Sequence, residues 1–100
     1  MIDWTQIKGF DWDSGNGRKS VDKHDVSQAE AEQVFFNAPL LVVEDQKHSG
    51  AEPRLHALGH TDEGRHLHIS FTLRGGGTHL RVISARDISR KERKIYAEEA

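Results

Sequence analysis

The stretch that decides the fold is His66-Leu-His-Ile-Ser-Phe-Thr-Leu73, in which polar and apolar side chains alternate without interruption. Alternation with a period of two is typical of a β-strand that turns one face to the core and the other to polar surroundings. The run Gly75-Gly-Gly77 follows, and glycines supply the positive φ angles that a tight loop needs. The next apolar run, residues 80–85, is therefore expected to return as the antiparallel partner.

Further strands are expected on the N-terminal side of this hairpin. Residues 40–43 form a short apolar run, residues 54–59 alternate, and residues 46–53 are a polar loop between them. Phe10 and Trp12 alternate with aspartates, which indicates a short edge strand. The chain therefore predicts a small antiparallel sheet of three to five strands.

One helix before the sheet has clear start and stop signals. Ser27 and Glu30 have the spacing of a capping box, in which each side chain satisfies a backbone N–H of the other residue. Apolar residues follow at helical spacing, and the helix has to end by Ala38 because Pro39 disfavours helical geometry in the residue before it.

Two more helices complete the expected fold. A second capping box, Ser89 and Glu92, opens a C-terminal helix, and residues 16–24 predict a short first helix. Two N-terminal helices, a run of strands and a C-terminal helix indicate an α+β domain with its helices on one face of the sheet. We expect residues 1–100 to be a single domain, with residues 1–9 as an N-terminal arm.

Composition excludes several classes of protein. The chain has 100 residues, no Cys and a formal net charge of -2, so disulfides and thiolate metal sites are excluded. No apolar stretch reaches the about 18 residues that a membrane helix needs, and the N-terminus lacks the pattern of a signal peptide. We therefore expect a cytoplasmic protein without a membrane partner.

The charges are distributed unevenly. Residues 1–64 carry six Lys and Arg against twelve Asp and Glu, whereas residues 65–94 carry eight against two. A basic segment of this kind attracts phosphate groups, but it also fits a solvated face or a surface for an acidic protein.

The polar side of residues 66–73 carries imidazole and hydroxyl groups, with Arg74 at its end. Such a face can hold a phosphodiester and move protons beside it, although antiparallel sheets commonly turn polar residues to water. His56, His60, His66 and His68 also raise the possibility of a zinc site. No carboxylate motif accompanies them, so no metal and no cofactor is expected.

Two other regions contain candidate functional residues. By parity, Arg81 and Arg86 point to opposite faces of their strand unless a bulge intervenes. His24 closes the first predicted helix, where a protonated imidazole interacts favourably with the helix dipole. That position fits either a general acid or a structural residue.

The chain resembles the BrnT family of toxins over about residues 10–96. The motifs that carry the resemblance are Lys23-His24 with Val26-Ser27, Glu52 with Arg54, and Arg81-Val-Ile-Ser-Ala-Arg86 continuing through Glu92-Arg93 to Tyr96.

The resemblance implies a RelE-like fold and a type II toxin that cleaves RNA without a metal and so inhibits translation. It also implies a small DNA-binding antitoxin, BrnA-like, as the partner, with operator DNA bound only through the complex of the two proteins. Asp25 stands where the family commonly has Gly, and His60 stands where it commonly has Arg. The second difference replaces a permanent charge by a group that is mostly neutral at pH 7.

The family's recurring polar positions give the candidate site residues. We expect His24 to transfer a proton, Arg74 and Arg81 to hold the phosphate, and Arg86 to act as a third phosphate ligand or as a buried organiser. The residues expected to contact RNA elsewhere are Lys19, Lys23, Arg54 and His60. The alternative hypothesis is a catalytically silent member of the family that mainly binds the antitoxin and acts as a co-repressor.

Overall fold

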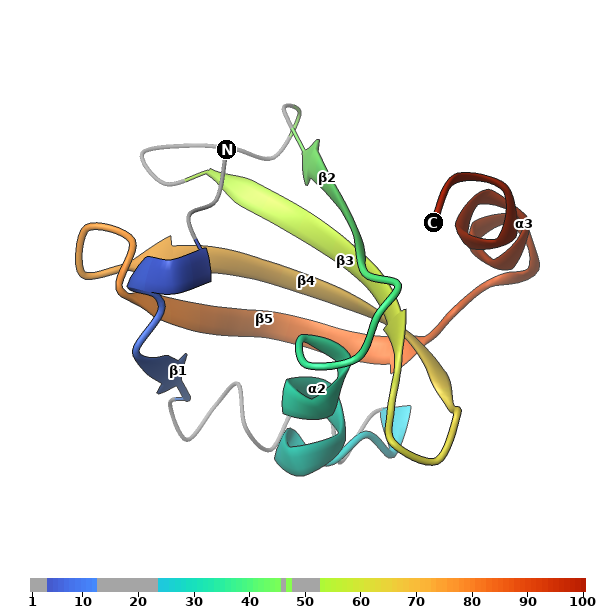
Figure 1. The fold of residues 1–100 in the computed structure, drawn as a ribbon, viewed down its shortest axis with the longest axis horizontal. Helices are drawn as coiled ribbons and strands as arrows, with labels where there is room; N and C mark the ends of the chain where they lie inside the picture. Colours follow the sequence, from blue (N-terminus) through green and yellow to red (C-terminus); the bar gives the residue numbers. More distant parts are fainter. Residues whose placement is uncertain (1–3, 13–23, 46, 48–52) are drawn as a thin grey trace.

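The computed structural model describes residues 4–12, 24–45, 47 and 53–100. Figure 1 shows a twisted sheet with one helix against it and a second helix beyond the end of the last strand. In chain order the elements are the 3₁₀ helix η1 (Trp4–Gln6), β1 (Gly9–Asp11), α2 (Gln28–Val34), β2 (Leu41–Asp45), β3 (Arg54–His60), β4 (His66–Arg74), β5 (His79–Asp87) and α3 (Arg90–Glu99). Of the helix predicted over residues 16–24, residues 16–23 lie outside the described residues, and His24 is helical.

The sheet has five strands in the order β1-β5-β4-β3-β2. The pairs β2–β3, β3–β4 and β4–β5 are antiparallel, as predicted, but β1 runs parallel to β5. The sheet is therefore mixed rather than wholly antiparallel. The alternating Phe10 segment does form an edge strand, and parity alone carries no information about its direction.

One face of the sheet forms the hydrophobic core. Leu67, Ile69 and Phe71 of β4 are completely buried, and Ala31 and Val34 of α2 are buried in the same cluster. The predicted capping box is present, because Ser27 Oγ accepts from the Glu30 N–H and the Glu30 carboxylate accepts from the Ser27 N–H. The apolar residues that alternate along residues 66–73 and those at helical spacing after Ser27 therefore pack in the same core.

The helices lie on two faces of the sheet, so the expectation of a single helical face is wrong. Whereas α2 packs on the apolar face, α3 contacts side chains of the opposite face. The side chains that attach α3 to the sheet are polar, so the helix packs on the polar face rather than on the apolar one. Glu92 bonds to Arg86, and the Tyr96 hydroxyl lies beside His60 and donates to the Pro39 carbonyl.

A bulge changes the faces of β5. Ser70 pairs with Ser84 and Phe71 pairs with Val82, so Ile83 is an extra residue on β5. An extra residue reverses the parity of everything beyond it. As a result Arg81 lies opposite Thr72 and Arg86 lies opposite His68. Both arginines therefore share the polar face, which parity without a bulge would not allow.

The start of the described chain contacts the rest of the protein. The Lys8 N–H donates to the Thr78 carbonyl at 2.7 Å, and the Trp4 ring lies 6.2 Å from the Phe35 ring. The part of the expected arm that the structure describes is therefore docked. None of the helices in the described ranges combines the length and the apolar character that a membrane crossing requires.

Candidate functional site

The polar face of the sheet collects most of the candidate residues. By register, its central row joins Arg54, Thr72 and Arg81 on three adjacent strands, because Thr72 pairs with Arg81 and Arg54 precedes the pair Leu55–Phe71. Strands lie about 4.8 Å apart, so the backbones of the two arginines are about 10 Å apart with a hydroxyl group between them. Asp45 pairs with Arg54, and Asp11 pairs with Arg81. The row thus has two cations at its centre and a carboxylate at each end.

Arg74 extends this row at the rim of the sheet. It follows Thr72 by two residues on the same face and pairs with His79 in the register, and its side chain is exposed. Thr72 itself is buried, and its hydroxyl donates to the Pro53 carbonyl at 2.6 Å. Arg54, Arg74 and Arg81 therefore lie at one end of the polar face, whereas Arg86, expected as a possible third phosphate ligand, lies toward the other end.

A chain of polar side chains lies beside the row. Asp45 Oδ2 lies 2.8 Å from His56 Nε2, and His56 Nδ1 lies 2.9 Å from Ser70 Oγ. The His56 ring is 4.8 Å from that of His68, and the Asp45 and His56 side chains are largely buried. An aspartate on one nitrogen fixes the tautomer of the ring and leaves the other nitrogen to a hydroxyl group that can rotate.

The sequence contains no recognisable motif for this chain of contacts. Asp45, His56 and Ser70 come from β2, β3 and β4, and only the pairing of the three strands brings them together. The alternation of β4 did indicate that Ser70 and His68 share a face, but the register with β3 could not be predicted.

The other end of the polar face lies beneath α3. Arg86 donates two hydrogen bonds of 2.8 Å to the two carboxylate oxygens of Glu92. These bonds hold the pKa of Glu92 at about 2. Arg86 thus contacts α3, although its side chain is 37% exposed rather than buried, and its role stays a prediction. His60 Nδ1 lies 3.3 Å from the Tyr96 hydroxyl, so His60 also faces α3.

His24 lies elsewhere. Its carbonyl accepts from Arg65, whose guanidinium also bonds to Glu30 of α2 and to Asp87. Asp87 pairs with the core residue Leu67, so this cluster belongs to the α2 side of the sheet.

The expectation that His24 and the arginines surround one phosphodiester is not met in this structure. Asp87 and Arg81 stand six residues apart along β5, which separates their backbones by about 20 Å, and they belong to opposite faces. Arg65, which the sequence did not single out, is the residue that fixes the His24 segment. Lys19 and Lys23 lie outside the described residues.

The described ranges contain no group of three or more His, Cys, Asp or Glu side chains that could hold a metal ion. His56 and His68 stack, and His60 and His66 lie 6.0 Å apart by ring centroids. The four histidines that raised the possibility of a zinc site are thus divided between two pairs.

The backbone at Asp25 adopts a conformation that favours glycine, the residue that the resemblance implies at this position. Asp25 has a φ of 54°, in the left-handed region, and its carbonyl accepts from Arg65 at 2.8 Å. Side chains other than Gly, Asn and Asp adopt this region at a cost of about 1–2 kcal/mol. We expect Asp25→Ala to be about 1 kcal/mol less stable than Asp25→Gly in urea unfolding. Equal stability of the two variants would contradict this account.

A pH dependence of stability follows from the residues beneath α3. Burial, with the Arg86 charge adding to it, lowers the pKa of His68 below its ordinary value of 6.5, and burial also lowers that of His66. The unfolded chain therefore binds more protons than the folded one below about pH 6.5, and stability falls as the pH falls. A second loss is expected between about pH 4.5 and pH 2, where Glu92 becomes protonated.

Urea unfolding between pH 8 and pH 5 measures the first of these losses. We expect His68→Leu to flatten the dependence in this range, because the buried imidazole is then absent. A variant with the pH dependence of the original chain would contradict the assignment to His68.

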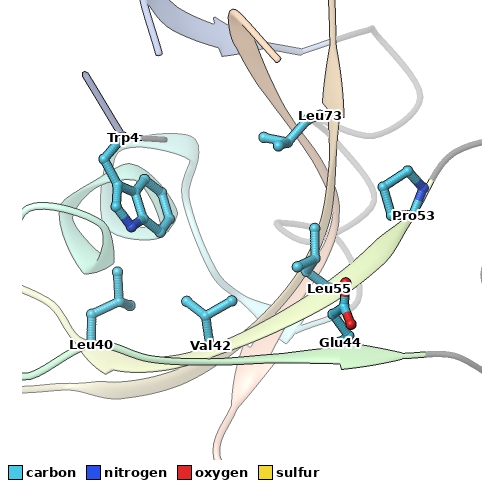
Figure 2. Close-up of a pocket in the computed structure, with 7 residues that line it drawn as sticks. All are labelled: Trp4, Leu40, Val42, Glu44, Pro53, Leu55 and Leu73. Atoms are coloured by element: carbon cyan, nitrogen blue, oxygen red, sulfur yellow. The ribbon is translucent and has the colours of Figure 1, made fainter. Parts of the chain in front are cut away.

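A separate apolar groove lies on the core side of the sheet, away from the polar face. Its volume is about 550 Å³. Figure 2 shows the Trp4 ring at one wall and Glu44 at the opposite end. The residues that line it are Trp4, Leu40, Val42, Glu44, Pro53, Leu55 and Leu73.

In the described residues, one face of a small α+β sheet thus combines arginines, hydroxyl groups and imidazoles. Surfaces of this composition are typical of proteins that bind nucleic acids. A family model described as the ribonuclease toxin BrnT of type II toxin-antitoxin systems matches residues 12–92, and the chain belongs to this family. A search of curated protein sequences found no match. The match confirms the resemblance found in the sequence, and the family name supports ribonuclease activity and an antitoxin partner in general terms.

Proposed function

We propose that the chain is a ribonuclease toxin that binds RNA on the polar face of its sheet and cleaves it there without a metal. The observation that carries this proposal is the bulge at Ile83, which places Arg81 on the same face as Arg54 and Thr72. Guanidinium groups on a fixed sheet can bind the phosphate oxygens of one RNA strand, and Arg74 adds a fourth contact point at the rim.

Cleavage of a phosphodiester by the neighbouring 2′-hydroxyl needs a base, a cation and an acid. The base removes the 2′-proton, the oxygen attacks phosphorus, and the leaving 5′-oxygen takes up a proton. Proton transfer contributes about 10²- to 10⁴-fold in rate, and stabilisation of the phosphorane charge often contributes more. Arg54, Arg74 and Arg81 are our candidates for the cations.

His56 is our candidate for proton transfer on this face. Asp45 holds its Nε2, and Nδ1 contacts the hydroxyl of Ser70, which can turn to another acceptor and release the nitrogen. His24, the earlier candidate, lies on the α2 side and would have to act on a different part of the substrate. The roles of Lys19, Lys23 and His60 in RNA contact stay predictions.

The antitoxin is proposed to be a small DNA-binding protein of the BrnA kind, with operator DNA contacted only through the complex. We propose a cytoplasmic site of action, where messenger RNA is available.

The test is an assay of the purified chain with a fluorescently labelled single-stranded oligoribonucleotide in the presence of EDTA. We expect cleavage products that end in a 2′,3′-cyclic phosphate, and no cleavage when the oligonucleotide carries 2′-O-methyl groups. Products that form only with added divalent metal would contradict the mechanism. An inactive chain that still binds the product of a neighbouring small gene would favour the silent antitoxin-binding module.

A further inference from the structure

The carboxylate of Glu92 lies among hydrogen-bond donors. Oε1 accepts from Arg86 Nη1 at 2.8 Å and from the Ser89 N–H at 2.8 Å, and Oε2 accepts from Arg86 Nη2 at 2.8 Å. His68 Nε2 lies 3.7 Å from Oε2. Arg86, on the polar face of the sheet, therefore binds a carboxylate that α3 supplies, and His68 of the same face lies close to it but beyond hydrogen-bond distance.

The cap of α3 does not require this arrangement. A capping box uses one carboxylate oxygen of Glu92, and the contacts of Oε2 with Arg86 and His68 are additional. The other capping box offers a comparison, because Glu30 also pairs with an arginine, Arg65.

The two arginines differ in their remaining partners. Arg65 donates twice to Asp87 and also to the carbonyls of His24 and Asp25, so it is held without its glutamate. Arg86, by contrast, donates to Glu92 and to one neighbouring carbonyl. Loss of Glu92 would therefore leave Arg86 able to take another anion.

His68 adds a second donor that lacks a full set of partners. The residue is 9% exposed, and its buried Nδ1 has no hydrogen-bond partner in the part of the chain that the structure describes. Its Nε2 points toward Glu92. A guanidinium fork beside an imidazole is a donor set that suits the oxygens of a phosphate.

The side-chain contacts that hold α3 on the sheet involve mainly Glu92 and Tyr96. Tyr96 is the only buried residue of α3, and its hydroxyl donates to the Pro39 carbonyl at 2.6 Å. Figure 1 shows α3 beyond the end of β5, on the side away from β1. An element with one buried side chain lies at the low end of local stability.

We propose that Arg86 and His68 form a binding site for one phosphodiester group of RNA, and that Glu92 occupies this site until α3 moves away. The inference rests on the proposed function, because it adds a second phosphate site to the face that carries Arg81. The two sites belong to one strand face and are roughly 15 Å apart along β5. The carboxylate of Glu92 thus acts as an autoinhibitory substitute for substrate.

The test is the binding of the full chain to a 2′-O-methylated single-stranded oligoribonucleotide, followed by fluorescence anisotropy. Glu92→Gln keeps a capping side chain but removes the charge. We expect it to bind about tenfold more tightly than the original chain. The slope of the logarithm of its association constant against the logarithm of the salt concentration should be steeper than that of the original chain by about 0.7. This is the change expected for one additional phosphate contact with a single strand.

Three further variants test the assignment, one of them as a matched control. Glu30→Gln makes the same change in the other capping box and should leave the affinity and the salt slope unchanged. Tyr96→Phe loosens α3 without touching Glu92 or Arg86, and it should also tighten binding. Adding Arg86→Ala to Glu92→Gln should abolish the gain.

Unchanged or weaker binding by Glu92→Gln, with measurable binding by the original chain and by Glu30→Gln, would overturn the inference and leave the proposed function intact. Failure of the original chain and of every variant to bind the oligonucleotide would overturn the proposed function and the inference together.

Discussion

Arg81→Ala is expected to lower the rate of RNA cleavage by about 10²- to 10³-fold, the effect of removing one preorganised charge-stabilising donor from a transition state. Arg81 lies in the central row of the polar face, opposite Thr72 and two strands from Arg54. Its guanidinium is always charged and can donate two parallel N–H hydrogen bonds to two phosphate oxygens. Because negative charge builds up on these oxygens in the phosphorane, the bonds stabilise the transition state more than the ground state.

Single-turnover cleavage of the labelled oligoribonucleotide measures this effect. Arg81→Lys should recover part of the rate, because it restores the charge without the planar fork. Arg90→Ala, an exposed position of α3, is the matched control and should change the rate less than about threefold.

His24→Ala distinguishes the two faces of the sheet. Because His24 lies with Arg65 on the α2 side, we expect it to retain most of the activity. A full rate for Arg81→Ala, together with loss of activity in a folded His24→Ala protein, would place the chemistry on the α2 side and contradict the proposal.

Phe71→Ala is expected to destabilise the protein by about 3–5 kcal/mol, the usual cost of removing a buried aromatic ring. Phe71 is 0% exposed, and its ring packs edge-on against Phe35 at 5.2 Å. It also lies on β4 next to the point where Ile83 bulges on β5, so the cavity would form where the two registers of the hairpin meet. A domain of this size is stable by about 5–15 kcal/mol, so a large share of its stability is at risk.

Urea unfolding monitored by circular dichroism measures this loss. Phe36→Ala is the matched control, because Phe36 is 77% exposed and its replacement should cost less than about 0.5 kcal/mol. A loss below about 1.5 kcal/mol for Phe71→Ala would show that the core does not depend on this ring.

Local patterns in the sequence predicted most of the elements of the fold. Strand β4 forms where the alternation predicts it, although both faces of residues 67–72 are buried, and both capping boxes begin helices within one residue of the predicted positions. These features depend on neighbours in the chain, since backbone N–H groups at a helix start are satisfied within four residues and a strand alternates by geometry.

Features that depend on distant contacts could not be predicted. The bulge at Ile83 is visible only in the pairing of β4 with β5, and it decides which face carries Arg81. The face chosen by α3 depends on Glu92 and Tyr96 finding polar partners across the sheet. Parity likewise could not show that β1 is parallel to β5.

The candidate site was predicted in part. The sequence indicated that Arg74 and the polar side chains of β4 share a face, and that Arg86 could serve as an organiser. It missed the Asp45–His56 contact, because β2 and β3 are separated by a long loop and their register sets that pair. It also missed Arg65, whose four partners come from three separate segments.

The most direct test of the account is a ¹⁵N NMR titration of the full chain with a 2′-O-methylated oligoribonucleotide, which binds but cannot be cleaved. The account predicts that the largest shift changes occur at the amides of Arg54, Thr72 and Arg81 on the polar face. Changes confined to His24, Arg65 and Asp87, at saturating oligonucleotide, would contradict it.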